Sequence, residues 1–575
     1  MEAEMDPKNE LTERLKTALK NLLAEEGVAG EPPEIVVEAP RNREHGDYAT
    51  NVALQLARAL NRNPMQIAEA LLERFDGEGL VAEATVAKPG FINFRMAGEA
   101  AASILRRIAE EGPRFGRAQT GAGRRVLVEF VSANPTGPLH IGHARNAVVG
   151  DVLARLYAAT GHEVVREYYF NDAGAQMDML GNTLRLRVRE QLGRPVEWPA
   201  SEVDAETGEE RGTYYKGGYM IDIAKAMIEE LGPEEAGADH PTQFFTDCAV
   251  RPILKTFDDD LRAMGIPFDN WFREKSLYED GKVTRAIENL RERGEIYEEG
   301  GATWFRATRW GDGRDRVVVK SNGAYTYLIG DVAYNEDKFS RNFDCLVNLL
   351  GADHHGQVAS LIAAAEALGH PKEKLRYVIY QMVTLLRGGV TMKLSTRAGE
   401  FITLKEMIDE LGVGVVRYFF AMRSPDAQMV FDWDLAKDTS MDNPVYYVQY
   451  AHARCRSLFR KAEEVGCPYL GVEKADLSLL AHPDEKAIVQ ALGRLPEVVH
   501  SAAADLAPQD LTNYLQEVAQ LFHNFFTKGN NDPALRIIIP DQPALTQARL
   551  ALTDALRTVL ANALGILGIE PIERM

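Results

Sequence analysis

Two histidines with two residues between them, His140 and His143, carry the clearest chemical signal in the sequence. They follow an apolar run at 126–131 and a turn rich in proline and glycine, and a helix-prone stretch at 144–149 comes next. A strand, a turn and a helix start in this order place two imidazoles one helical turn apart at the positive end of a helix dipole, beside backbone N–H groups that lack partners. Gly142 leaves room for a flat base near the backbone. The pattern predicts a nucleotide phosphate site with two hydrogen-bond donors.

A loop far downstream carries two cations. Gly388 and Gly389 precede it, and Lys393 and Arg397 lie within it with the hydroxyl of Ser395 between them. Flanking glycines allow a loop to close, and the cations could neutralise the negative charge that grows on a departing pyrophosphate. A His-x-x-His pair by itself is more often a solvated or metal-binding coincidence, and the loop by itself is weak evidence. Together they favour nucleotide chemistry.

These two stretches together resemble the signature of class I aminoacyl-tRNA synthetases. Residues 140–143 match the family's HIGH sequence letter for letter, and 393–397 resemble its KMSKS loop as Lys-Leu-Ser-Thr-Arg. The resemblance implies catalytic roles for His140, His143, Lys393 and Arg397, and ATP contacts for these histidines, Gly142, Lys393 and Ser395. Thr396 stands where a second lysine is usual. We expect Arg397 to compensate, because a guanidinium is always charged.

Acidic residues indicate which amino acid is activated. Glu129 interrupts an otherwise apolar strand, where a buried acid would be costly without a cation. Asp331 follows an apolar run at 325–329 that we expect to be a strand, and strand ends are where such folds bind ligands. Several acids would suit a guanidinium, through paired hydrogen bonds, better than a neutral side chain. The competing interpretation places Glu129 on an exposed edge strand.

The sequence around these acids resembles arginyl-tRNA synthetases, at 129–137, 327–331 and 395–401. The resemblance implies an arginine pocket made by the following residues: Glu129, Asn134, Glu274, Tyr327, Asp331 and Gln357. It also implies that the ATP ribose lies at Gly351 and Asp353, and the adenine beside the backbone of Met382 and Val383. Acids around one guanidinium would make lysine a poor competitor, since lysine lacks the planar fork.

Three stretches of different composition must position these residues. Residues 1–115 predict an α+β unit with helices at 11–23 and 65–75 and a strand at 89–95. Residues 116–435 predict a Rossmann-like parallel sheet with helices on it, interrupted by a polar surface insertion at 193–239. Its strands are expected at 126–131, 163–169, 325–329, 345–350 and 377–383. Residues 436–575 predict an all-α bundle. Its helices are expected at 444–464, 484–506, 509–527 and 543–567.

The last of these stretches resembles the anticodon-binding domain named after Asp-Ala-Leu-Arg, here residues 554–557, and the first resembles the N-terminal unit of the bacterial enzymes. We expect tRNA contacts from aromatic, amide and basic side chains in these two units: Phe91, Asn93, Tyr447, Tyr450, Arg454, Phe526 and Met575. Aromatic residues can stack on unpaired bases. Helical spacing makes core packing the competing role for the bundle aromatics, as it also does for Phe522 and Phe525.

Composition sets the context of this chemistry. A chain of 575 residues is too long for one hydrophobic core, and a net charge of -20 argues against general affinity for nucleic acids, although not against a local basic track. Four scattered cysteines lack a Cys-x-x-Cys pair, so neither a zinc knuckle nor a disulfide framework is expected. The sequence shows no apolar run of membrane-spanning length and no signal peptide. We expect a cytoplasmic monomer with no obligate protein partner and no metal site of its own.

The expected reaction has two steps and needs no protein nucleophile. The carboxylate of L-arginine attacks the α-phosphorus of ATP, which carries Mg²⁺, and a terminal ribose hydroxyl of tRNA then takes the arginyl group. Two alternatives stay open. A small-molecule adenylyltransferase could contain the turn with the two histidines but would not need the terminal units. A catalytically idle tRNA-binding paralogue would be expected to lose the histidines or Asp331, and all are present.

Overall fold

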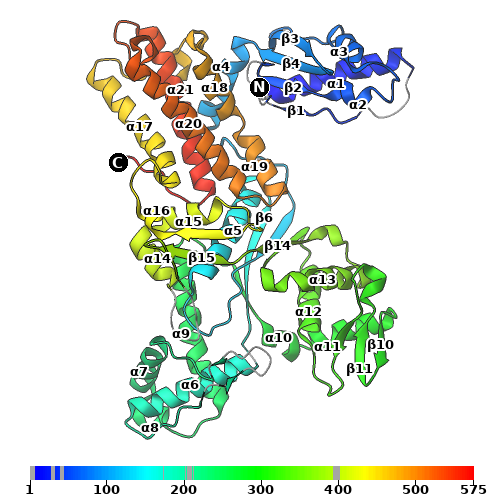
Figure 1. Ribbon diagram of the computed structural model, residues 1–575, viewed down its shortest axis with the longest axis vertical. Helices are drawn as coiled ribbons and strands as arrows, with labels where there is room; N and C mark the ends of the chain where they lie inside the picture. The colour runs from blue at the N-terminus through cyan, green and yellow to red at the C-terminus, as the bar shows by residue number, and fades with distance from the viewer. Residues whose placement is uncertain are drawn as a thin grey trace.

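The computed structural model describes residues 7–27, 33–38, 40, 45–172, 174–200, 202–203, 210–211, 213–392 and 402–575. Figure 1 shows an elongated molecule with a helical bundle and the N-terminal unit at one end, a sheet in the middle and two lobes towards the other end. Among the described residues, no helix is long and apolar enough to cross a membrane.

The N-terminal unit packs three helices on a four-stranded sheet of order β1-β2-β4-β3. The helices are α1 (Pro7–Glu25), α2 (Val52–Leu56) and α3 (Pro64–Leu72), and the strands are β1 (Val37–Glu38), β2 (Tyr48–Thr50), β3 (Val81–Ala87) and β4 (Phe91–Met96). The two predicted helices and the predicted strand are confirmed. This unit has a hydrophobic core of its own, whose buried residues run from Leu11 to Ala100.

Helix α4 (Gly98–Glu111) leaves that core and joins the main body of the molecule. It packs against α18 (Pro483–Gly493) and α21 (Pro543–Ile566), and Leu105 and Ile108 are buried in the main core. The N-terminal unit is therefore tethered to the helical bundle by a helix that the bundle itself buries.

The central sheet has five parallel strands in the order β14-β13-β5-β6-β9. They are β5 (Arg125–Glu129), β6 (Glu163–Phe170), β9 (Asn270–Arg273), β13 (Cys345–Gly351) and β14 (Leu375–Tyr380). Continuous apolar strands are typical of a parallel sheet covered on both faces, and the predicted Rossmann-like fold is confirmed. Helix α5 (Ile141–Ala159) follows β5, and α13 (His355–Ala367) follows β13. The carboxyl ends of these strands face the site described below.

The strand expected at 325–329 is wrong. Tyr325 forms only an isolated bridge with Val319, and helix α12 (Tyr327–Ser340) begins two residues later. Short apolar runs are ambiguous between strand and helix, and here Ile329, Val332 and Ala333 lie buried along one helix. Asp331 therefore comes from the first turns of a helix.

The strand expected at 377–383 is two strands. Strand β14 ends at Tyr380, and β15 (Val383–Arg387) belongs to a second sheet of order β16-β15-β17 with β16 (Val390–Met392) and β17 (Met429–Asp432). Strand β9 was not predicted. It is only four residues long, and an asparagine and an arginine flank its two apolar residues.

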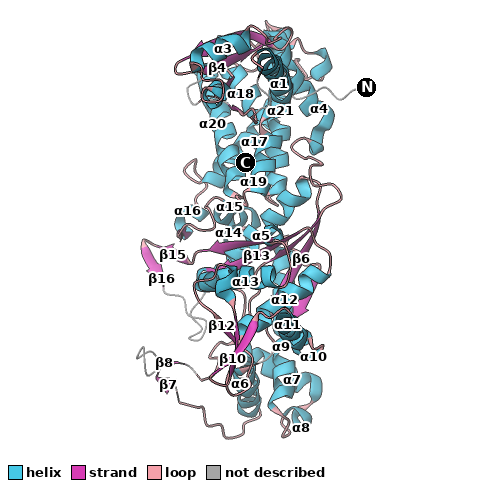
Figure 2. Ribbon diagram, turned by 90° about the vertical axis from the view of Figure 1, so that its right-hand side faces the viewer, coloured by secondary structure: helices cyan, strands magenta, loops and turns pink. Residues whose placement is uncertain are grey.

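Two lobes project from the sheet (Figures 1 and 2). One contains α6 (Ala175–Gln191), α7 (Tyr219–Leu231), α8 (Pro233–Ala236) and α9 (Thr242–Ala263), together with the short strands β7 (Glu202–Val203) and β8 (Glu210–Arg211). The predicted polar insertion falls here, but α7 buries Met220, Ala224 and Met227, so only part of it is surface. The other contains α10 (Glu274–Glu279), α11 (Lys282–Glu292), α12, α13 and the antiparallel strands β10 (Ile296–Glu299), β11 (Ala302–Phe305) and β12 (Arg316–Val319).

Helices α14 (Leu404–Leu411), α15 (Val413–Ala421) and α16 (Trp433–Lys437) lead from the sheet into the bundle. The bundle consists of α17 (Pro444–Glu464), α18, α19 (Leu495–Ala504), α20 (Gln509–Asn531) and α21. Its predicted helices are confirmed, except that the one expected at 484–506 is broken after Gly493. Pro496 explains the new start, because proline fits the first turn of a helix but not its interior.

Arg417 on α15 joins four segments that are distant in the sequence. Its guanidinium is fully buried and donates to the carbonyl oxygens of Leu567, at 2.7 Å, and Met264, at 3.0 Å, and to the carboxylate of Asp151 on α5, at 2.5 Å. Asp151 accepts from Arg155 as well, at 2.6 Å. The helix that carries His140 and His143 at its start is thereby fixed to the last helix of the chain.

Candidate active site

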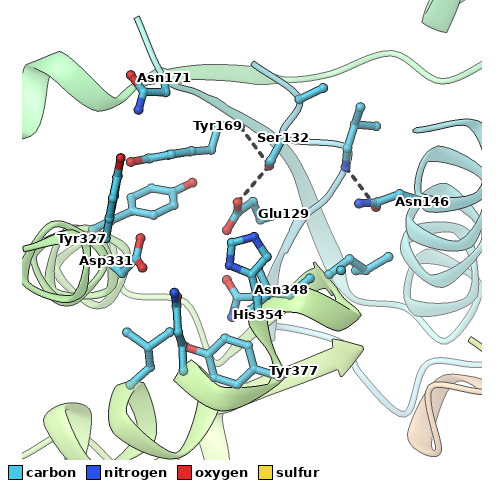
Figure 3. A pocket seen from close by; sticks show the side chains of 18 of the residues that line it. Glu129, Ser132, Asn146, Tyr169, Asn171, Tyr327, Asp331, Asn348, His354 and Tyr377 are labelled. Atoms are coloured by element: carbon cyan, nitrogen blue, oxygen red, sulfur yellow. Dashed lines mark hydrogen bonds between the residues drawn. The ribbon is translucent and has the colours of Figure 1, made fainter. Parts of the chain in front are cut away.

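A cavity of about 530 Å³ opens where the carboxyl ends of β5, β6 and β13 meet the first turns of α5, α10 and α12. This volume is typical of a small-molecule site. The cavity brings together nine of the predicted site residues: Glu129, Asn134, His143, Glu274, Tyr327, Asp331, Gly351, Asp353 and Gln357. Figure 3 shows Asp331 and Tyr327 projecting from one helix on the side of Glu129 and Tyr169.

Other predicted residues lie elsewhere. His140, Gly142, Met382 and Val383 are not among the residues that line the cavity. Met382 is 71% exposed just before β15, so the predicted contact with adenine would lie beside the cavity rather than inside it. Lys393, Ser395 and Arg397 lie outside the described residues.

His140 and His143 cap the helix on which they lie. The backbone N–H of Gly142 donates to Nδ1 of His140, at 3.2 Å, and the backbone N–H of His140 donates to Nδ1 of His143, at 3.3 Å. The two rings stack with their centroids 3.9 Å apart. The expectation that these backbone N–H groups lack partners is therefore corrected, because the imidazoles take two of them. An Nδ1 that accepts places the ring proton on Nε2.

Both imidazoles are neutral at pH 7. Burial lowers the pKa of His140, and burial followed by the neighbouring His140 lowers the pKa of His143 to about 3. Each ring thus carries an Nε2–H at the positive end of α5 without carrying a charge of its own. The predicted pair of hydrogen-bond donors fits this arrangement.

Glu129 has the cation that its burial requires. It is 6% exposed on a strand in the middle of the sheet, which rules out the exposed edge-strand interpretation. Its Oε2 accepts from Nζ of Lys338, at 2.6 Å, and its Oε1 accepts from the hydroxyl of Ser132, at 2.9 Å. The charge of Glu129 is therefore already balanced by the protein.

Asp331 and Glu274 complete an acidic wall. Desolvation, followed by the charges of Glu129 and Glu274, raises the pKa of Asp331 to about 7, although Lys338 opposes this rise. Burial also raises the pKa of Glu274, against a hydrogen bond from Tyr169 that lowers it. Carboxylates crowded in this way attract a cationic ligand, which would relieve their mutual repulsion.

Amide and aromatic groups border these acids. Asn134 is exposed and donates to Gln176, at 2.9 Å, while Gln357 lies near the start of α13. Tyr327 is 81% exposed at the first position of α12, next to the cavity. Such amides suit the amino and carboxylate groups of an amino acid, whereas the acids suit a cationic side chain.

Sequence reasoning missed Arg145, whose only signal is a cation near the start of a helix rich in small apolar residues. Its buried guanidinium donates to the carbonyl oxygens of Gln381, at 2.7 Å, Ser424, at 2.9 Å, and Ala427, at 2.9 Å. Gln381 directly precedes the two residues expected beside adenine. Arg145 therefore holds helix α5 against the backbone that precedes Met382 and Val383.

Four residues predicted to contact tRNA form one cluster on α17 and α20. The guanidinium of Arg454 lies 4.3 Å from the ring centroid of Tyr450 and 4.2 Å from that of Phe526. Tyr447 joins through His523, at 4.6 Å between ring centroids, and the members of the cluster other than His523 are half-buried. Phe522 and Phe525 are buried in the bundle, as the competing interpretation holds.

The remaining tRNA candidates lie in the C-terminal tail and in the N-terminal unit. Met575 is 50% exposed at the end of a tail that Gln449 and His452 hold against α17, beside the bundle in Figure 1. Phe91 is 37% exposed on β4, but Asn93 on the same strand is only 7% exposed. Asn93 therefore offers little surface to a partner.

Comparison with protein families finds three successive matches. Residues 9–96 match the arginyl tRNA synthetase N terminal domain, residues 106–416 match the catalytic domain of class I tRNA synthetases (R), and residues 448–575 match the DALR anticodon binding domain.

Whole proteins match as well. An arginine–tRNA ligase of Syntrophotalea carbinolica is 45% identical over 95% of this chain and 96% of its own, and one of Bacillus subtilis is 42% identical over 99% of each. A solved structure titled a putative arginyl-tRNA synthetase, from Campylobacter jejuni, is 32% identical and superposes with a TM-score of 0.72 over 83% of this chain and all of its own. That of the Thermus thermophilus arginyl-tRNA synthetase, at 24% identity, shares the fold with a TM-score of 0.75 over 99% of this chain and all of its own.

Proposed function

The chain belongs to the arginyl-tRNA synthetase family, and from this premise we propose that it joins L-arginine to tRNA at the expense of ATP in the cavity described above. The observation that carries the proposal is one cavity shared by four carboxylates and by His143 at the start of α5. The acids suit a guanidinium, and the helix start suits phosphate. A small-molecule adenylyltransferase would not need the terminal units, which match the family as well.

In the first step the arginine carboxylate attacks the α-phosphorus of ATP in line, and pyrophosphate leaves. Asp331 and Glu274 hold the guanidinium, and Asn134 and Gln357 hold the amino-acid end. The Nε2–H groups of His140 and His143 donate to phosphate oxygens as negative charge develops on them, so catalysis comes from position and charge rather than from a protein nucleophile. Mg²⁺ enters with ATP as part of that substrate.

Lys393 and Arg397, in the loop outside the described residues, neutralise the departing pyrophosphate, and Ser395 contacts ATP. In the second step a terminal ribose hydroxyl of tRNA attacks the arginyl carbonyl, and AMP leaves. The aromatic cluster around Arg454 contacts the anticodon end of the tRNA through stacking and a cation, both of which suit unpaired nucleotides. Residues 1–115, 116–435 and 436–575 act as elbow-binding, catalytic and anticodon-binding domains. The chain acts as a cytoplasmic monomer without an obligate protein partner.

A charging assay tests this function directly. Total tRNA is incubated with the purified protein, ATP and each amino acid in turn. We expect arginine alone to be esterified to tRNA. Charging with another amino acid would overturn the arginine pocket, and no charging at all would favour a catalytically idle paralogue.

Arginine binding is expected to weaken as the pH falls through about 7. The pKa of Asp331 is raised to about 7 in the free cavity, and a bound guanidinium favours the ionised carboxylate. Below that pH a proton must leave Asp331 before arginine binds, so the affinity falls by up to about tenfold per pH unit. Above pH 8 Asp331 is ionised already and adds no further pH dependence. Isothermal titration at pH 6–9, in buffers of different ionisation enthalpy, measures the affinity and the released proton together. An affinity that does not change between pH 6 and 8 would contradict this prediction.

A further inference from the structure

Lys338 is a charged group placed inside the cavity by the fold. It lies on α12, is 1% exposed, and its Nζ donates to Oε2 of Glu129, at 2.6 Å, and to Oδ1 of Asn348, at 2.5 Å. The ammonium also lies 3.8 Å from the ring centroid of Tyr334. Three neighbours from three elements therefore hold one ammonium, and burying it costs free energy that these contacts must offset.

The charges in the cavity are unequal without a ligand. Of the described residues, four carboxylates line it, those of Glu129, Glu274, Asp331 and, at the end of β13, Asp353, whereas Lys338 is the only lysine or arginine among them. Glu167, the nearby buried acid on β6, accepts from Arg341, at 2.8 Å, so that pair balances separately. One internal cation against these acids leaves an excess of negative charge, which suits the guanidinium of arginine.

The groups that face Lys338 and Asp331 come from six elements around the cavity. They are Glu129 on β5, Glu167 and Tyr169 on β6, Glu274 on α10, Tyr334 and Arg341 on or beside α12, Asn348 on β13 and Tyr377 on β14. Glu129 links the two residues, because it accepts a hydrogen bond from Lys338 and its charge raises the pKa of Asp331.

We propose that Lys338 is a positioning and specificity-determining residue of the arginine site, which fixes Glu129 and balances its charge, so that the carboxylates of Asp331 and Glu274 are left for one guanidinium. The inference rests on the proposed function. Lys338 acts through Glu129 and needs no contact with the substrate. Its ammonium takes the acceptors of Glu129 and Asn348 and leaves the carboxylates of Asp331 and Glu274 for the substrate. Paired carboxylates favour the planar fork of a guanidinium over the single ammonium of a lysine side chain.

The test is a double-mutant cycle with arginine binding, measured by isothermal titration, as the readout. The variants are Lys338→Met, Glu129→Gln and the pair of them. We expect Lys338→Met to weaken arginine binding by about 10- to 100-fold at pH 7.5, near the lower end of the cost of removing one partner of a buried charge pair, because Lys338 acts through Glu129, and ATP binding by less than about threefold. The doubly substituted protein should bind arginine no more weakly than Glu129→Gln alone, because Lys338 has nothing left to position.

The pH profile separates this role from a merely structural one. Removing the cation that opposes protonation of Asp331 should move the acid limb of arginine binding to higher pH by about one unit. Lys338→Arg should restore most of the affinity. Lys282→Met is a matched control. Lys282, on α11, pairs at 2.9 Å with Asp337, the residue before Lys338 on α12, and it does not line the cavity. It should leave arginine binding and its pH profile unchanged.

The outcomes are distinguishable. Additive effects of Lys338→Met and Glu129→Gln, or an unmoved acid limb, would overturn the role of Lys338 while arginine binding by the unaltered protein still supports the proposed function. If the unaltered protein binds no arginine, the proposed function fails first. If Lys338→Met does not fold, Lys338→Arg and Lys338→Gln carry the same comparison of pH profiles, with Glu129→Gln as the reference.

Discussion

Replacing Asp331 by asparagine should weaken arginine binding by about 100-fold and leave ATP binding within about threefold. The substitution keeps the shape of the side chain but removes the carboxylate whose pKa burial and neighbouring acids raise to about 7, and which a guanidinium would ionise. Truncating one partner of a desolvated charge pair costs about 2–5 kcal/mol, and each 1.4 kcal/mol is about tenfold in affinity. Separate titrations with arginine and with ATP measure the two effects.

A suitable control for this substitution lies on the same helix. Glu336→Gln removes a carboxylate that faces His370 rather than the cavity, and it should change neither affinity. Equal weakening of arginine and ATP in Asp331→Asn would count against the guanidinium pocket and point to a general distortion of α12 instead.

Replacing His143 by alanine should lower the rate of adenylation by about 10- to 1000-fold, with little change in the affinity for arginine. The lost Nε2–H is one donor to phosphate oxygens in the transition state, and donors of this kind are worth factors in that range. Rapid-quench measurement of adenylate formation at saturating arginine and ATP gives the rate, and titration gives the affinity. An unchanged rate would remove His143 from the mechanism.

The protonation state of the histidines adds a second check. The pKa of His143 is lowered to about 3, so the ring is neutral throughout the range in which the reaction is measured. The rate at saturating arginine should therefore show no limb near pH 6.5. A limb there that disappears in His143→Ala would mean that the imidazole works as a cation.

The sequence predicted most of the scaffold because its signals are local. Apolar runs such as 126–131 indicate buried strands, and a proline or glycine marks the ends of elements. The run at 325–329 failed for the same reason, because five residues rich in aromatic side chains do not distinguish a strand from the start of a helix. Asp331 was nevertheless expected in the site, because the family resemblance at 327–331 implies a role in the arginine pocket whether that segment is a strand or a helix.

The missed residues share one property, which is burial of a charge. Arg145 and Lys338 look like solvated positions on helices, and only the folded chain shows that they are buried among carbonyl groups and acids. The hydrogen bonds of His140 and His143 were missed as well, because side-chain rotamers decide them. Local patterns can specify which residues approach a site. They do not show which buried cations balance the charges of those residues.

Arg417 has a consequence for how this protein is made. Its guanidinium is buried between segments from the middle of the chain, yet one of its acceptors is the carbonyl of Leu567 at the end of the last helix. A ribosome releases that segment long after the sheet and the histidine helix have emerged. Until it docks, a buried cation lacks a hydrogen bond worth about 1–3 kcal/mol, and the apolar cluster that spans both regions is incomplete. We therefore expect the catalytic core to gain this part of its stability only when synthesis is nearly finished, and to expose apolar surface of the kind that chaperones bind until then.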